Sequence, residues 1–149
     1  DGYVHHVQIH PGLGHWMNRL DAVAVPWMAK FSRTPLPTRV VWKQDDVRHE
    51  SFYWLAAPLE ETIGRIQITA AINKQVIALD GPPGKKILVR LNDGLVNLDQ
   101  AISVTANGKQ VYNDKVNRTI GTLARTLLTR HDPYLMFSSE LEIELPPKN

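Results

Sequence analysis

Short β-strand patterns at even spacing predict a mainly β fold for most of this 149-residue chain. From residue 39 onward, runs of β-branched and aromatic residues alternate with turn segments rich in Gly, Pro, Asn and Asp. About seven such strands, interrupted by one helix pattern, are typical of a β-sandwich of the immunoglobulin-like type. A proline-containing linker further predicts that a shorter unit precedes this β-sandwich.

The linker divides the chain near residue 34. Residues 32–38 hold two prolines and lack any apolar periodicity. We therefore expect a short terminal unit over residues 1–34 and a β-sandwich over residues 35–149.

The sequence of the terminal unit predicts a strand, a tight turn and a helix. Residues 3–10 alternate apolar and polar side chains, which favours a strand, and the proline and two glycines that follow would end it. Asp21 is a plausible cap for a helix over residues 22–31. Because proline is not tolerated deep inside a helix, the regular part of this helix is expected to begin at Pro26.

The second unit predicts a succession of strands. Asn107-Gly108 favours a type I′ hairpin turn, since both positions accept positive φ, and Asn92-Asp93-Gly94 is a further hairpin signal. The expected strands cover residues 39–43, 51–55, 64–70, 75–79, 85–91, 102–106, 109–112 and 134–145.

One helix pattern interrupts these strands. Its apolar residues recur at helical spacing and form a single stripe, and Thr119 or Asn117 can cap its start. Asp132-Pro133 would end it, and the arginines at 118, 125 and 130 are expected to form a solvated polar side. The stripe consists of Ile120, Leu123, Ala124, Leu127 and Leu128.

Composition excludes several classes of protein. The chain has no cysteine, so it can hold no disulfide, thiolate metal site or cysteine nucleophile. A formal net charge of +2 gives no reason to expect nucleic acid as a partner. The sequence has no apolar run long enough to span a membrane, so we expect no membrane partner. The compartment stays open, with a slight preference for a periplasmic or secreted protein.

The start of the sequence predicts a piece of a longer protein. Residue 1 is Asp, the first methionine is Met17, and no signal-peptide pattern follows the first residue. We therefore expect a processed end, with function divided between this piece and residues upstream.

The most specific chemical signal is the segment Gly12-Leu13-Gly14-His15-Trp16-Met17, between the predicted strand and helix. A glycine turn at this place fixes an imidazole and leaves its ring accessible, as a general base requires. With His10-Pro11 before it, the segment resembles the last-strand-to-last-helix region of α/β-hydrolases, specifically bacterial esterases and peptidases related to dienelactone hydrolase and prolyl oligopeptidase. The resemblance implies that His15 is the catalytic histidine of the parent enzyme.

This resemblance covers about residues 1–33 and makes them a strand–turn–helix remnant of an α/β-hydrolase. It implies that residues 21–31 are the C-terminal helix that packs on the hydrolase sheet. The remainder resembles an accessory C-terminal β-domain found on some large bacterial hydrolases. No cofactor is expected.

A serine nucleophile is missing from the chain. Hydrolases of this type order their triad as Ser, acid, His, with the serine in a Gly-x-Ser-x-Gly turn that does not occur here. We therefore expect the chain alone to have no hydrolase activity. The serines without flanking glycines are Ser32, Ser51, Ser103, Ser138 and Ser139.

Partners follow from the resemblance. A strand and helix that evolved to pack on a large sheet would expose apolar surface without that sheet. We expect residues 1–31 to bind the rest of the parent hydrolase, to dock on the β-sandwich or to form a homodimer.

Two groups of residues suggest metal sites, and neither meets the requirements. On a strand, His6 and His10 would lie about 13 Å apart, too far to share one ion, and His5 would face the other way. Asp45, Asp46 and His49 have the spacing of a solvated turn. No metal site is therefore expected.

Two other functions stay open. Exposed Trp42, Tyr53 and Trp54 could stack on sugar rings, which would make the β-sandwich a carbohydrate- or cell-wall-binding module. A complete small enzyme would need His15 with Asp21 or Asp45 as its acid–base partner.

Overall fold

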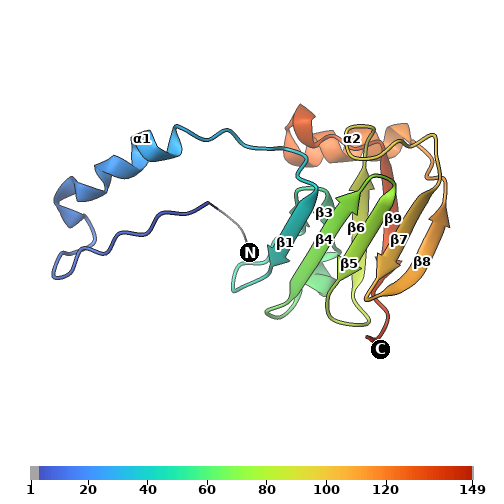
Figure 1. The fold of residues 1–149 in the computed structure, drawn as a ribbon, viewed down its shortest axis with the longest axis horizontal. Coiled ribbons are helices and arrows are strands. Elements are labelled where there is room, and N and C mark those ends of the chain that lie inside the picture. Colours follow the sequence, from blue (N-terminus) through green and yellow to red (C-terminus); the bar gives the residue numbers. More distant parts are fainter. Residues whose placement is uncertain (1–3, 149) are drawn as a thin grey trace. The chain divides into compact units, whose positions relative to one another are not determined.

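The computed structural model describes residues 4–148. The chain divides into two compact units between Thr34 and Pro35, and each is described by itself below. The longer unit is mainly β, with its described strands arranged in two sheets (Figure 1). This confirms the expected mainly β fold and is consistent with a β-sandwich.

The larger sheet has five strands in the order β1-β4-β5-β7-β8. All its neighbours pair antiparallel except β5 and β7, which pair parallel. The strands are β1 (Arg39–Lys43), β4 (Gln67–Asn73), β5 (Val76–Asp80), β7 (Ile102–Ala106) and β8 (Lys109–Asp114).

The smaller sheet has four antiparallel strands in the order β2-β3-β6-β9. They are β2 (Ser51–Phe52), β3 (Leu55–Ala56), β6 (Lys86–Leu91) and β9 (Ser139–Glu144). The chain therefore leaves the larger sheet after β5, contributes β6 to the smaller one, and returns for β7.

The core of this unit is one hydrophobic cluster built from both sheets. Side chains alternate along the strands, as in β5, where Ile77 and Leu79 are buried and their neighbours are exposed. Trp54 is fully buried, and its indole N–H donates to the Pro37 carbonyl at 2.7 Å. This bond satisfies the polar atom of the side chain within the core.

The helix expected after the strands is present as α2 (Ile120–Arg130). The Thr119 hydroxyl accepts a hydrogen bond from the Thr122 N–H at 3.1 Å, so Thr119 is the cap. At the other end His131 adopts the left-handed conformation, with φ of 51°.

The apolar stripe of α2 faces away from the core of its own unit. Ile120 is 85% exposed and Leu128 is 68% exposed, whereas Thr122 and Thr126 are buried. The Thr126 hydroxyl donates to the Thr122 carbonyl at 2.9 Å and accepts from the Phe137 N–H at 3.0 Å. These bonds let a polar helix face pack on the β-sandwich without an unsatisfied group.

Two expectations about the strands are wrong in detail. The expected strand over residues 51–55 is split into β2 and β3, because Tyr53 takes a positive φ of 53° and the chain reverses there. Residues 134–138 are not part of the last strand: a 3₁₀ helix, η3 (Pro133–Leu135), precedes β9.

The expected hairpin at residues 92–94 is also not formed. Asn92 does make a turn, accepting from the Gly94 N–H at 3.1 Å and donating to the Met136 carbonyl at 3.0 Å. However, β6 and β7 lie in different sheets, so this turn begins a crossover. By contrast, the Asn107-Gly108 turn joins β7 and β8 as predicted, with φ of 48° and 81°.

The terminal unit differs most from its prediction. Residues 4–10 form no strand, and Tyr3 lies outside the described residues. A strand needs a neighbouring strand for its backbone hydrogen bonds, and no described strand pairs with this segment.

The predicted helix over residues 22–31 is shorter than expected. A 3₁₀ helix, η1 (Met17–Val23), leads into a five-residue α1 (Ala24–Met28). Asp21 lies inside η1 and does not cap α1, which begins after Val23 without a side-chain cap. Proline in the middle of so short a helix also limits its length.

A further 3₁₀ helix, η2 (Leu59–Thr62), follows β3. Within residues 4–148, no helix combines the length and the apolar character that crossing a lipid bilayer requires.

Candidate functional site

The predicted catalytic histidine lies on an exposed glycine turn. Gly12 has a φ of +74°, a conformation that glycine adopts without strain, and the Met17 N–H closes the following turn on the Gly14 carbonyl at 2.9 Å. His15 is exposed, and a side chain added at Gly12 or Gly14 would meet no described atom. The turn therefore presents the imidazole and leaves space beside it.

No acid–base partner accompanies His15 within the described residues of its own unit, 4–34. Its ring contacts only the neighbouring Trp16, edge to face, with ring centroids 5.1 Å apart. Asp21 instead lines a 150 Å³ hollow together with His6 and His10. Within this unit the structure therefore does not pair His15 with Asp21.

The residues considered as metal ligands do not form a metal site. The His6 ring lies beside Trp27 at 6.0 Å between centroids. Asp45 and Asp46 each accept from the Arg65 guanidinium at 2.9 Å. In the part of the chain that is described, no three His, Asp or Glu side chains are arranged to hold an ion.

The aromatic residues considered for sugar binding are mostly internal. Trp42 and Trp54 are buried in the hydrophobic cluster, and Tyr53 is half-buried against it. Trp42 stacks on Phe52 at 6.5 Å between centroids. The exposed aromatic surface on which the carbohydrate hypothesis depended is therefore absent at Trp42 and Trp54.

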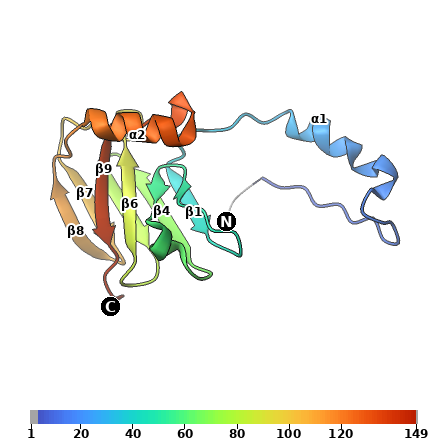
Figure 2. The same cartoon turned by 180° about the vertical axis from the view of Figure 1, so that it is seen from behind.

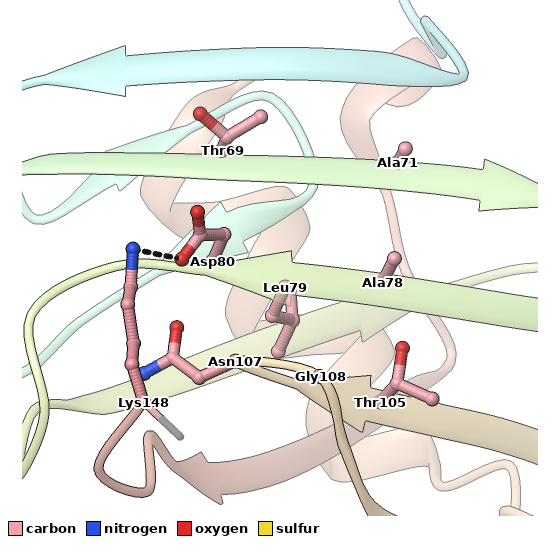
Figure 3. A pocket seen from close by; sticks show the side chains of 9 residues that line it. All are labelled: Thr69, Ala71, Ala78, Leu79, Asp80, Thr105, Asn107, Gly108 and Lys148. Atoms are coloured by element: carbon pink, nitrogen blue, oxygen red, sulfur yellow. Dashed lines mark ion pairs between the residues drawn. The ribbon is translucent and has the colours of Figure 1, made fainter.

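A large hollow of about 570 Å³ lies on the outer face of the five-stranded sheet (Figure 3). Its floor is made of small side chains, including Ala71 and Ala78, which are cross-strand partners. At its rim the Lys148 ammonium pairs with the Asp80 carboxylate at 2.7 Å. Thr69 and Thr105 also line it, while none of the lining residues is aromatic.

Several polar groups of this hollow are already paired. Asp80 is neutralised by Lys148, and the Asn107 amide is engaged by the backbone of Gly81 and Pro146. The lining includes no histidine and no serine. Small side chains and a few hydroxyl groups favour binding through shape and hydrogen bonds.

Sequence reasoning missed a cluster of two arginines and one glutamate. Glu140 accepts from Arg90 Nε at 2.9 Å and from Arg125 Nη2 at 2.8 Å. Arg90 is a charged residue within an apolar run in β6, and it is mostly buried. The sequence signal for this cluster is the arginine inside an apolar run, because a buried charge needs a partner.

A second ionic cluster fixes the segment before α2. The Arg118 guanidinium donates to both Asp93 oxygens, at 2.6 and 3.1 Å, and to Asp99 at 2.7 Å. The hydrogen bond from Arg118 holds the pKa of Asp93 below its usual value of 3.8. The same bonds raise the pKa of Arg118 further above its ordinary range. Arg118 is exposed, as expected for a solvated polar side, and it also joins the β6–β7 loop to the segment before α2.

Comparison of the chain with protein-family models, with curated proteins and with solved structures finds no match. The candidate functions below accordingly depend on the chain's own residues and geometry.

Proposed function

We propose that this chain is the non-catalytic C-terminal part of a serine hydrolase, with an accessory β-sandwich that packs against the hydrolase body. The observation that carries the packing role is the apolar face of α2, which points away from its own core. Contiguous exposed apolar surface marks an interaction site. The occupant proposed here is the α/β-hydrolase portion of the parent enzyme.

The terminal unit supports the same proposal. Its large apolar side chains are exposed, and packing of this unit on the hydrolase sheet would cover them. The side chains concerned are Val4, Val7, Ile9, Leu13, Trp16, Leu20, Val23, Val25, Met28 and Phe31.

His15 would contribute the general base in the parent enzyme. Its glycine turn leaves the imidazole accessible, and the nucleophile and the acid would come from the hydrolase body. The β-sandwich itself would not touch the reacting atoms.

The immunoglobulin-like arrangement is part of the same proposal. Apart from the two-residue β2 and β3, seven strands of the described residues form the two sheets. The parallel β5–β7 pair departs from the fully antiparallel sheets of that fold.

Esterase activity tests the division of the catalytic site. The chain alone is expected not to hydrolyse p-nitrophenyl esters, whereas a longer polypeptide that includes upstream residues should be active. In that longer polypeptide His15→Ala should reduce kcat by about a thousandfold or more, and His49→Ala is the matched control. Turnover by the chain alone that depends on His15 would overturn the proposal.

The packing role needs a separate test on α2. Leu128→Lys should leave the stability of this chain unchanged but loosen the β-sandwich from the hydrolase body in the longer polypeptide, which limited proteolysis would detect. Gln110→Lys on β8 adds the same charge at another exposed position. Equal protease resistance in both variants would contradict packing through α2, and concentration-dependent dimers lost only in Leu128→Lys would assign the face to self-association instead.

A further inference from the structure

The arginine cluster borders a hollow that the proposed function does not use. This hollow has a volume of about 280 Å³ and is bounded by α2 and by strands β2, β3 and β6. Figure 2 shows α2 lying across one end of the smaller sheet, above β6 and β9. Ala56 and Leu88, which pair across β3 and β6, give it an apolar surface.

Two arginines from different elements line this hollow. Arg90 comes from β6 and Arg125 from α2. Both bind Glu140, which lies opposite Arg90 on β9 and uses one oxygen for each arginine. One carboxylate therefore balances two cations, and the three side chains carry a net charge of +1.

The guanidinium of Arg90 retains donors that Glu140 does not use. Only its Nε donates to Glu140, and its side chain is 11% exposed. Among the described residues no fully buried side-chain nitrogen lacks a hydrogen-bond partner. The nitrogens of Arg90 that do not bond Glu140 are therefore not fully buried, and Arg90 is one of the residues that line the hollow.

We propose that this hollow binds a small ligand through an oxyanion, a carboxylate or a phosphate, held between Arg90 and Arg125. Planar guanidinium groups bind both kinds of oxyanion through paired N–H donors. The Ser51 hydroxyl supplies a further polar group, and the apolar side accommodates a short hydrocarbon chain.

Glu50 sets a limit on the affinity. This exposed residue also lines the hollow, and a carboxylate there repels a bound anion. Removing its charge should therefore strengthen binding. If the arginines only held α2 against β9, this change would have no effect.

The test uses the full chain and two probes, sodium phosphate and sodium succinate, at constant ionic strength. NMR would follow the Nε–H signals of Arg90 and Arg125, with sodium chloride as the reference salt. We expect saturable shift changes at these signals with at least one probe. Saturation by succinate alone would assign the site to carboxylates, and saturation by phosphate alone to phosphates.

Three variants separate a binding site from general charge effects. Arg125→Gln should weaken binding about tenfold, as expected for a charge-assisted hydrogen bond, whereas Arg65→Gln, which removes the same charge at the Asp45–Asp46 turn, should not. Glu50→Gln should strengthen binding severalfold and leaves the arginine cluster intact. Shifts that do not saturate with either probe, or equal effects of Arg125→Gln and Arg65→Gln, would overturn the proposal.

Discussion

At the scale of single residues, polar side chains inside or beside the core hold loops and helices in place. Thr126 is fully buried, yet each of its hydroxyl bonds goes to backbone groups of α2 or of the segment before β9. Arg118 joins the β6–β7 loop to the residues that precede α2. These bonds explain how a helix with a polar inner face stays attached.

Thr126→Val should destabilise the protein by about 1–3 kcal/mol, because valine leaves the Phe137 N–H buried without an acceptor. Thr129→Val is the matched control, since the Thr129 hydroxyl also bonds a helix carbonyl but is exposed. Urea unfolding would measure both variants. A free energy of unfolding that is equally lowered by the two substitutions would contradict this account.

Asp93 should make stability depend on acid pH. Its pKa is lower in the folded protein than the unfolded value of 3.8, so the folded state favours the charged form. The stabilisation is present above about pH 3.8 and is lost as the pH falls through the lower pKa of the folded chain.

Asp93→Asn should therefore lower the melting temperature at neutral pH and flatten its decrease in acid. Thermal unfolding between pH 2 and pH 7 would show this effect, with Asp114→Asn as a control on β8. A variant that keeps the full acid dependence would assign it to other carboxylates.

At the scale of elements, alternation and turn chemistry allowed much of the β unit to be predicted. The Asn-Gly hairpin and α2 follow local rules, since their residues specify φ or capping on their own, and β1 follows from its β-branched and aromatic residues. Mispredicted elements have both local and distant causes, since Tyr53 splits one strand by its positive φ whereas the first segment lacks a distant partner. Residues 4–10 have the pattern of a strand but no neighbour to pair with.

Of the candidate sites, only the one that depends on local backbone turns could be predicted. The glycine turn at His15 follows from the sequence, whereas the arginine cluster depends on which residue of β9 stands opposite Arg90. Strand order and register are tertiary properties, and the single sequence offers no local signal for them. Which face of α2 packs inward was not predictable either. The buried face carries hydrogen-bonded threonines, whereas the apolar stripe faces outward.

One asparagine fixes the position of the β7–β8 hairpin through hydrogen bonds. The Asn107 side chain bonds the backbone of Gly81 twice and the Pro146 carbonyl once. Asn107→Gly keeps the positive φ but removes these bonds, so we expect a loss of about 1–3 kcal/mol in urea unfolding. Lys74→Gly, at another positive-φ turn, should be neutral or stabilising, and a similar loss there would contradict this interpretation.

At the scale of the whole molecule, the two units should differ in stability. The hydrophobic cluster belongs to residues 36–145, whereas η1 and α1 contain no buried residue. Limited proteolysis should therefore cut within residues 4–38 first and leave a resistant product that begins near residue 35.

This product should unfold in urea at the same midpoint as the β-sandwich of the full chain. Mass spectrometry would identify the cleavage positions. Initial cleavage inside the sheets, or a product with a clearly lower midpoint, would show that the terminal unit stabilises the β-sandwich.

The pairing of β6 with β9 also has a consequence for synthesis on the ribosome. The β4–β5 and β7–β8 hairpins can close as soon as each has emerged, because their partners are near in sequence. The smaller sheet, by contrast, lacks its strand next to β6 until β9 has been made, and β9 is the last strand of the described residues. During translation β6 therefore keeps an unpaired edge until residues 139–144 have been made and can pair with it.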